Sequence, residues 1–201
     1  KTAGADRIMS VDLHAAQSQG FFDGPVDHLV AMPVLVDYIR DRFQGHLDNV
    51  AVVSPDAGRI RVAEQWAQRL GGGPLAFVHK TRDITRPNQA VANRVVGDVA
   101  GKDCVLVDDL IDTAGTIAGA CHVLQDAGAK SVTVVATHGV LSGPAIDRIN
   151  DSVITELALL DTIPAIDPKK SSKIKYLQVA PMFAEAIERI YQEISISKLF
   201  R

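Results

Sequence analysis

Short runs rich in β-branched residues alternate along the chain with segments of helical periodicity, and this alternation constrains the fold more than any other feature. Several of the runs are apolar at every position, which is typical of parallel strands covered by helices on both faces. The sequence therefore predicts an α/β fold with a central, mostly parallel sheet flanked by helices. The expected strands are residues 7–13, 50–54, 75–79, 104–108, 131–137, 155–160 and 174–179.

Helix signals separate the expected strands. Pro33 suits the first turn of a helix over residues 34–43, Thr116 suits the cap of a later helix, and Pro181 suits the start of the last one. Apolar residues recur at three- and four-residue spacing in each helical segment, which predicts one buried face per helix. The expected buried positions are Leu35, Ile39, Phe43, Val62, Trp66, Leu70, Ile117, Cys121, Leu124, Phe183, Ala184, Ile187 and Ile190.

Charge and cysteine content exclude several functions. The 201 residues include 21 Lys and Arg against 24 Asp and Glu, and the formal charge of −3 provides no general positive field for nucleic acid or an anionic membrane surface. The apolar runs are shorter than the roughly 18 residues that a membrane-spanning helix needs. Cys104 and Cys121 fall in an apolar strand run and a helix run, which indicates buried thiols in a reducing compartment. We therefore expect a cytoplasmic protein that binds neither nucleic acid nor membrane.

The strongest functional signal is the run 104–116, Cys-Val-Leu-Val-Asp-Asp-Leu-Ile-Asp-Thr-Ala-Gly-Thr. An apolar strand ends in Asp108 and Asp109, and a turn rich in Thr and Gly leads into a helix, which is where open α/β sheets bind ligands. The N–H groups of such a turn and the positive end of the helix suit phosphate, and paired carboxylates suit sugar hydroxyls, directly or through a divalent metal. An ordinary turn with a solvated acidic rim is the alternative, but the complete run predicts a ribose-phosphate site.

Residues 80–93 form a polar stretch without strong periodicity, which is typical of a functional loop or a disordered segment. Lys80 and Arg82 lie at its start. Surface lysines and arginines are commonly no more than solvated charges, so the composition by itself leaves a lid and a simple surface loop as alternatives.

The run 104–116 resembles the phosphoribosyl diphosphate fingerprint that type I phosphoribosyltransferases share with ribose-phosphate diphosphokinases. Other stretches resemble the diphosphokinase family in order and spacing, and the resemblance extends from about Ala3 to the C-terminus. These stretches are residues 11–14 (VDLH), 19–27 (QGFFDGPVD), 53–58 (VSPDAG), 79–80 (HK) with Arg82, 96–98 (VGD), 137–139 (THG), 142–145 (SGPA) and 162–164 (TIP).

The resemblance implies two similar phosphoribosyltransferase-like domains, with most of the first absent from this sequence. The expected divisions are residues 1–32 as the end of a truncated N-terminal domain, 33–168 as a C-terminal domain that binds ribose 5-phosphate, and 169–201 as a return strand and helix that pack toward the N-terminal domain. Apolar surface that the parent protein buries is then expected to be exposed.

The family reaction transfers the β,γ-diphosphoryl group of ATP to the anomeric hydroxyl of ribose 5-phosphate, giving AMP and phosphoribosyl diphosphate for nucleotide biosynthesis. The resemblance also implies Mg²⁺ as cofactor, phosphate and ADP as effectors, and a homo-oligomer built from dimers. The fragment alone is expected to be weakly active or inactive. Two alternatives are a non-catalytic regulatory subunit of the same family and a type I phosphoribosyltransferase.

Site roles follow from the resemblance, position by position. Lys80 and Arg82 would close over the triphosphate and stabilise the charge that moves toward the leaving phosphate. His14 and Asp56 would bind Mg²⁺. The residues that would bind ribose 5-phosphate are Asp108, Asp109, Asp112, Thr113, Ala114, Gly115 and Thr116.

Further candidates come from the same resemblance. Asp12, Asp23 and Asp27 match acidic metal or effector positions. The regulatory candidates are Gln19, Ser195 and Ser197, with Phe200 in the same C-terminal tail.

The chain departs from the family pattern at two places. Arg59 stands where many members have a second Gly, and Thr81 stands where Glu often precedes the catalytic Arg. Asp56, Lys80 and Arg82 are retained, so these changes bear on how the metal site and the lid are tuned.

Overall fold

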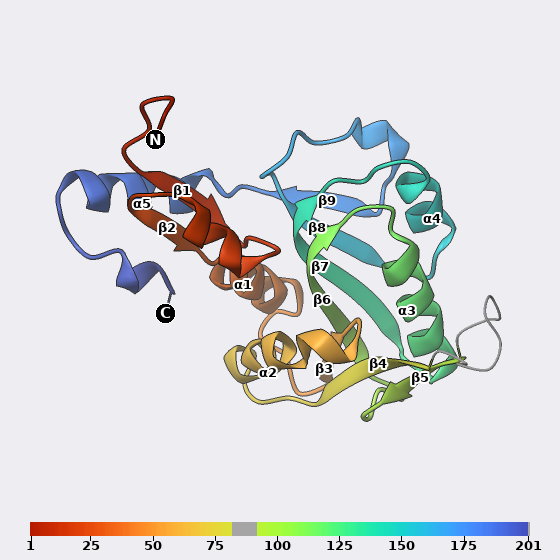
Figure 1. The fold of residues 1–201 in the computed structure, drawn as a ribbon. Coiled ribbons are helices and arrows are strands. Elements are labelled where there is room, and N and C mark those ends of the chain that lie inside the picture. The colour runs from red at the N-terminus through yellow and green to blue at the C-terminus, as the bar shows by residue number, and fades with distance from the viewer. Residues whose placement is uncertain (82–91, 201) are drawn as a thin grey trace.

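Two sheets organise the chain in the computed structural model, which describes residues 1–81 and 92–200 (Figure 1). Within those residues the larger sheet has the strand order β5-β4-β3-β6-β7-β8-β9, and the smaller sheet pairs β1 with β2. Every neighbouring pair is parallel except β4 with β5, so the predicted α/β class is confirmed. The strands are β1 (Ile8–Val11), β2 (Val26–Leu29), β3 (Val50–Ser54), β4 (Leu75–Thr81), β5 (Ala92–Val96), β6 (Asp103–Ile111), β7 (Ser131–Gly139), β8 (Glu156–Leu160) and β9 (Ile174–Leu177). The α-helices are α1 (Met32–Arg42), α2 (Ile60–Arg69), α3 (Gly115–Asp126), α4 (Ala145–Asp151) and α5 (Ala180–Tyr191).

The order in which the chain adds strands to the larger sheet changes direction between β3 and β6. From β3 the chain passes through α2 to β4 on one side, whereas from β6 it passes through α3 to β7 on the other. Such a reversal leaves a crevice at the carboxyl ends of the two strands, because their following connections diverge. The fold therefore provides a ligand site between the ends of β3 and β6.

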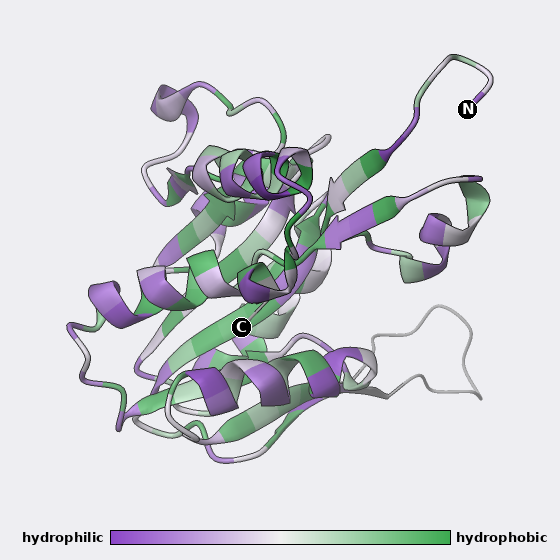
Figure 2. Ribbon diagram, turned by 90° about the vertical axis from the view of Figure 1, so that its left-hand side faces the viewer, coloured by the Kyte–Doolittle hydropathy of each residue, from purple (hydrophilic) through white to green (hydrophobic). Residues whose placement is uncertain are grey.

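Helices cover both faces of the larger sheet, and alternate strand residues point to the two faces. Leu106 packs with α3 and α4, whereas its neighbours Val105 and Val107 pack with α1 and α2. Figure 2 shows hydrophobic residues concentrated along the strands and alternating with hydrophilic ones along the helices. Cys104 and Cys121 are free and buried, as predicted, and burial raises the pKa of each thiol to about 12. Across the described part of the chain, no helix has the length and apolarity needed to cross a membrane.

Several local expectations are wrong. The cap position of α3 is Ala114, in the left-handed region at φ 58°, and Thr116 lies inside the first turn without capping the helix. Val62 and Ile187 were expected in the core but are 37% and 58% exposed, because each lies on the outward side of its helix. Ala184 is also exposed. Strands β2 and β5 and helix α4 were not predicted, because each is short and carries little periodic signal.

The small sheet is joined to the larger one through Asp12. This residue has φ 40°, and its Oδ2 accepts hydrogen bonds from Ala31 N at 3.2 Å and from Thr137 Oγ1 at 2.6 Å. The ring of His138 adds contacts from Nε2 to Val11 O and Asp12 O, both at 3.1 Å. These bonds hold the turn after β1 against the carboxyl end of β7. The expected return strand, β9, is the edge strand of the larger sheet, and the division at residues 32 and 168 stays a prediction.

Asp103 ties the start of β6 to the start of β7. Its Oδ1 accepts from Ser131 Oγ at 2.6 Å, and its Oδ2 accepts from Lys130 Nζ at 2.9 Å. Burial acts to raise the pKa of this carboxyl, but the bonds from Ser131 and Lys130 outweigh burial and hold the pKa below its ordinary value. The ionised form therefore stabilises the fold.

Asp103→Asn is expected to lower the free energy of unfolding by about 1–2 kcal/mol at pH 7. Because the folded-state pKa is depressed, the stabilisation is present above the unfolded pKa of about 4 and is lost as the pH falls through the folded value. Urea unfolding at pH 7, 5 and 3.5 should show the two proteins converging toward the lowest pH. Asp98→Asn, which breaks only the exposed 3.6 Å pair with Lys102, is the matched control and should change stability by less than about 0.5 kcal/mol. A constant difference between parent and Asp103→Asn across this range would contradict the assignment.

Candidate active site

A hollow of about 240 Å³ lies at the carboxyl ends of β3 and β6, where the sheet topology predicts a ligand site. We call it the switch-point hollow. It brings together every predicted ribose 5-phosphate residue and both predicted metal ligands. Its lining residues are His14, Asp56, Arg59, Asp108, Asp109, Leu110, Ile111, Asp112, Thr113, Ala114, Gly115, Thr116 and Ile117.

An extension of β6 raises the two carboxylates above the sheet. Pairing of β6 with β3 ends at Val53 and Leu106, but pairing with β7 continues to Ile111 and Gly139. Asp108 and Asp109 therefore lie beyond the end of β3, on a part of β6 that pairs only with β7 among the described strands. The predicted strand ended at residue 108, three residues before the end of β6. These three residues are stabilised by hydrogen bonds to β7, and this pairing cannot be predicted from the local sequence.

The turn from β6 into α3 has the geometry of an anion site. Ala114 turns the chain through the left-handed region, and α3 begins at Gly115 with the first residues of the helix, whose N–H groups have no partner within the helix, in the lining of the hollow. The helix dipole places partial positive charge at the same point. Thr113 and Thr116 are exposed there, so their hydroxyls are available to a ligand.

Two residues from the β7–α4 region hold this turn in place. Ser142 Oγ donates a hydrogen bond to Asp112 Oδ1, and Ser142 N donates to Asp112 O at 3.1 Å. Arg148 Nη1 donates to Thr113 O at 2.9 Å. Sequence reasoning did not find Arg148, because nothing in its local pattern separates it from a surface arginine. Its guanidinium adds a positive charge beside the turn.

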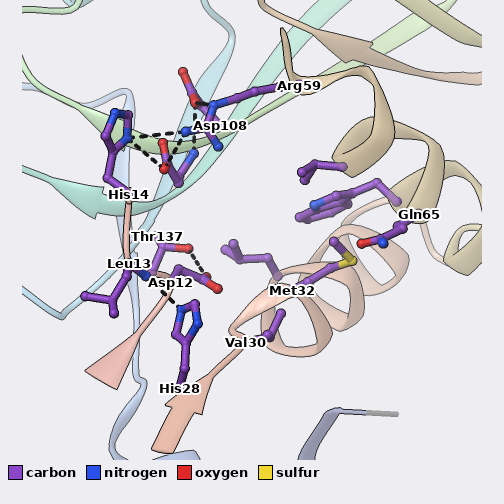
Figure 3. Close-up of a pocket in the computed structure, with 14 residues that line it drawn as sticks. Asp12, Leu13, His14, His28, Val30, Met32, Arg59, Gln65, Asp108 and Thr137 are labelled. Carbon is purple, nitrogen blue, oxygen red and sulfur yellow. Dashed lines mark hydrogen bonds and ion pairs between the residues drawn. The ribbon is translucent and has the colours of Figure 1, made fainter. Parts of the chain in front are cut away.

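Arg59 joins the two carboxylates and a histidine in one ion cluster (Figure 3). Arg59 Nη2 donates to Asp109 Oδ2 at 2.5 Å, and Arg59 Nε lies 3.3 Å from Asp108 Oδ1. His14 Nδ1 lies 2.9 Å from Asp109 Oδ2 and 3.3 Å from Arg59 Nη2. Figure 3 shows His14, Arg59 and Asp108 converging from three different segments of the chain. We call His14, Arg59, Asp108 and Asp109 the carboxylate cluster.

The turn after β3 positions Arg59. Asp56 caps the short 3₁₀ helix Ala57–Arg59, because its Oδ1 accepts from Gly58 N at 2.9 Å. Ser54 Oγ donates to Asp56 O at 2.6 Å and fixes the start of the turn. The sequence showed Arg59 only as a departure from the family pattern, and its contacts appear only when the turn after β3 faces the end of β6.

The cluster separates the pKa values of the two carboxyls. Burial is the largest influence on Asp108 and raises its pKa to about 6, although the charge of Arg59 acts in the opposite direction. Burial also acts to raise the pKa of Asp109, but the hydrogen bonds and charges of Arg59 and His14 outweigh burial and hold that pKa below its ordinary value. Asp109 is therefore a carboxylate near neutral pH, and Asp108 is the member of the pair that first takes up a proton as the pH falls.

The donor set in the switch-point hollow fits a Mg²⁺ ion that is shared with a phosphate ligand. Across residues 1–81 and 92–200, no group of three or more His, Cys, Asp and Glu side chains is placed to hold a metal by itself. His14 and Asp56 nevertheless line the same hollow as the anion-binding turn. Mg²⁺ in such sites takes one or two protein carboxylates and completes its coordination with water and phosphate oxygens. The residues present match that pattern.

A second hollow, of about 200 Å³, adjoins the switch-point hollow. The carboxylate cluster forms the wall between the two, since its four residues line both. The far side of the second hollow is largely apolar, with Val30 from the segment before α1, Met32 from the start of α1 and Trp66 from α2. Figure 3 shows Val30 and Met32 on this side.

The remaining predicted residues lie outside the switch-point hollow. Both oxygens of Asp27 bind Arg7, and Gln19 Nε2 lies 3.1 Å from His28 Nδ1. Asp12 forms the structural bonds described above, and Asp23 is exposed. Ser195 Oγ donates to Ser197 Oγ at 2.8 Å, and Ser195 shares a hollow of about 390 Å³ with Arg7. Lys80 is the penultimate residue of β4, and Arg82 lies outside the described residues.

An open sheet with a Thr-Gly turn and paired carboxylates at its switch point defines a phosphoribosyltransferase-like α/β domain. Residues 80–201 match the family model of the phosphoribosyl synthetase-associated domain, and the chain belongs to this family.

Named relatives agree with the family. Over 200 residues the chain is 80% identical to a ribose-phosphate pyrophosphokinase of Bifidobacterium longum. The aligned region is 100% of this chain and 59% of that relative. Over 200 residues it is 56% identical to a ribose-phosphate pyrophosphokinase of Corynebacterium efficiens, and the aligned region is 100% of this chain and 61% of that relative. The crystal structure of phosphoribosylpyrophosphate synthetase from Mycobacterium smegmatis superimposes with a TM-score of 0.85 at 50% identity, covering 96% of this chain and 61% of that one. The chain thus spans about three fifths of the length of these relatives.

Proposed function

We propose that this chain supplies the ribose 5-phosphate half of a ribose-phosphate pyrophosphokinase. The observation that carries the proposal is the switch-point hollow, where an anion-binding turn and two carboxylates line one space of about 240 Å³. A sugar with a phosphate at one end and hydroxyls at the other matches this arrangement. Identity of 80% to a ribose-phosphate pyrophosphokinase supports the same substrate.

The first turn of α3 would bind the 5-phosphate of the sugar through its N–H groups, with the hydroxyls of Thr113 and Thr116 as additional donors. Asp109, ionised near neutral pH, would accept hydrogen bonds from the ring hydroxyls, and Asp108 would lie beside it. This fixes the sugar at both ends. The anomeric oxygen is then held in one orientation, which converts much of the entropic cost of the reaction into a cost of binding.

In the proposed reaction, the anomeric hydroxyl oxygen of ribose 5-phosphate attacks the β-phosphorus of ATP, the bond from that phosphorus to the α,β-bridging oxygen breaks to release AMP, and the hydroxyl proton is lost to water. His14 and Asp56 would hold Mg²⁺, which supplies neutralisation of phosphate charge when bound. Lys80 and Arg82 would add positive charge where negative charge builds up in the transition state. The contacts to the ATP base would come from the part of the relatives that this chain does not span.

Self-association, with phosphate and ADP as effectors, is part of the same proposal. Phe21 and Tyr191 are 90% and 89% exposed, and Ile187 and Ile194 are also exposed large apolar residues. Exposed apolar groups of this size favour burial, either against the part of the relatives that this chain does not span or against a second copy in an assembly. The hollow that Ser195 shares with Arg7 would accept an anionic effector only if Arg7 exchanged its present partner, Asp27, for that anion.

Phosphorus NMR with MgATP and ribose 5-phosphate tests the proposed function. We expect the chain alone to bind ribose 5-phosphate by calorimetry but to produce AMP and phosphoribosyl diphosphate at least about 100-fold more slowly than a chimera, because one substrate site is incomplete. In the chimera, this chain replaces the matching 200-residue segment of the Bifidobacterium longum relative.

The outcomes separate the alternatives. Joint appearance of AMP and phosphoribosyl diphosphate in the chimera establishes the kinase reaction. A chimera that binds ribose 5-phosphate but transfers nothing would indicate a non-catalytic regulatory subunit. Consumption of phosphoribosyl diphosphate with a nucleobase would indicate a phosphoribosyltransferase, and equal turnover by the chain alone would show that the ATP site is complete within it.

A further inference from the structure

Arg59 occupies the centre of the wall between the two hollows. Its guanidinium contacts carboxylate oxygens of both Asp108 and Asp109 and lies 3.3 Å from His14 Nδ1. The side chains of Asp108, Asp109 and Arg59 are 13%, 14% and 25% exposed, so solvent screens their charges only partly. One fixed positive charge therefore neutralises half of a semi-buried pair of acidic groups.

His14, one of the two proposed Mg²⁺ ligands, lies beside Asp109, so a divalent cation at His14 and the guanidinium of Arg59 would compete for Asp109. Asp109 Oδ2 accepts from Arg59 at 2.5 Å and also lies 2.9 Å from His14 Nδ1. A cation bound between His14 and Asp109 would have to occupy the space that the guanidinium fills, and it would also meet the repulsion of that charge. Removal of Arg59 should therefore open the site and strengthen its negative field.

We propose that Arg59 is a built-in counter-cation of the carboxylate pair, and that a divalent cation binds Asp109 only by displacing its guanidinium. The proposal uses the residues of the proposed ribose 5-phosphate site, but its central claim concerns the protein and cation alone. Arg59 then has two roles. It keeps the carboxylates oriented before ligands bind. It also sets the cation concentration at which the metal replaces the guanidinium as the partner of Asp109.

The charge of Arg59 also affects how the sugar phosphate binds. Ribose 5-phosphate carries negative charge into a hollow that already contains two acidic side chains, and the guanidinium reduces that repulsion when no metal is present. Arg59 already lines the switch-point hollow, so its guanidinium, once displaced, would be close to the proposed anionic ligand. Arg59 is thus a positioning residue whose partner changes with the cation.

Direct binding of Mn²⁺ by the substrate-free chain, measured by electron paramagnetic resonance, tests the competition. Arg59→Gln should bind Mn²⁺ at least about tenfold more tightly than the parent, because it loses the competing charge. Arg59→Lys keeps the charge and should stay within about threefold of the parent. Arg61→Gln removes the same charge from an exposed position two residues along and should also stay within about threefold. Adding Asp109→Asn to Arg59→Gln should abolish the gain.

Two results would overturn the proposal. One is unchanged Mn²⁺ affinity in Arg59→Gln, and the other is an equal gain in Arg61→Gln, which would show a general effect of net charge. Circular dichroism and thermal unfolding establish that each variant is folded. If Arg59→Gln does not fold, Arg59→Gly takes its place with the same expected gain.

A spectroscopic measurement on the unmodified chain gives an independent answer. The Nε–H resonance of Arg59 in ¹⁵N-labelled protein should shift on titration with MgCl₂, since the contact to Asp108 is lost. A resonance that stays constant while Mn²⁺ binding is demonstrated would contradict displacement. Calorimetry with ribose 5-phosphate in the absence of divalent cations is a separate arm, in which Arg59→Gln should bind more weakly and Arg59→Lys should restore binding. Failure of the sugar to bind any variant would count against the proposed function and leave the cation results to decide this proposal.

Discussion

Lys80→Ala in the chimera is expected to lower turnover by about a thousandfold or more, while the affinity for ribose 5-phosphate changes by less than about threefold. Lys80 lies near the carboxyl end of β4, where its backbone is opposite Asn93 of β5. Because β4 neighbours β3 in the sheet, this position is at the same edge as Asp56 and the switch-point hollow. In the proposed reaction the charge of Lys80 would act on the triphosphate as charge moves toward the leaving group, so its loss is expected to affect turnover rather than sugar binding.

Steady-state kinetics and calorimetry with ribose 5-phosphate measure the two effects separately. Lys102→Ala is the matched control, since Lys102 precedes β6 at the opposite edge of the sheet and pairs there with Asp98. The control should retain turnover within about twofold, as is usual for surface substitutions remote from a site. A Lys80→Ala chimera with near-normal turnover would remove Lys80 from the mechanism.

Thr116→Asp is expected to weaken ribose 5-phosphate binding by about 100-fold, and to leave the fold as stable as the parent or slightly more stable. Thr116 is the second residue of α3 and is exposed, so a carboxylate there interacts favourably with the positive end of the helix, by about 0.3–1 kcal/mol. The same carboxylate lies in the lining of the switch-point hollow, where it repels a phosphate. Stability and binding should therefore change in opposite directions.

Calorimetry and urea unfolding of the chain test this pair of effects. Ala180→Asp is the control, because Ala180 is the exposed first residue of α5 and lies outside the hollow. It adds the same charge to the start of a different helix and should leave sugar-phosphate binding within about twofold. Unchanged affinity in Thr116→Asp would show that the phosphate does not bind at the start of α3.

The main elements of the fold could be predicted because their signals are local. Each of the seven expected strands overlaps an observed strand, and β3 matches residues 50–54 at both ends. The β6–α3 turn was also predictable, since its apolar strand, acidic pair and Thr-Gly run are consecutive in sequence. Strand β2 was missed because its four residues have no distinct pattern, and only pairing with β1 makes them a strand.

Packing decided several features that periodicity suggested wrongly. The apolar spacing of α5 predicted a buried Ile187, but this side chain faces away from the sheet and is 58% exposed. A threonine before a helical segment predicted a cap, but the turn needed a left-handed residue, and Ala114 occupies that position. In both cases the sequence pattern predicts how an average helix is buried or capped, whereas contacts with neighbouring elements decide the burial and the cap of this helix.

The sequence by itself determined the alternation of strands and helices, the Thr-Gly turn after β6 and the acidic pair, because each depends on residues within about one strand and one turn of each other. Only the tertiary structure placed Arg59 between Asp109 and His14, which are 50 and 45 residues away along the chain. The tertiary structure likewise bound Asp12 to Thr137, 125 residues apart. The physical reason is that such contacts depend on the order of strands in the sheet, which sets which loops meet at its edge, and that order is decided by the packing of the whole chain.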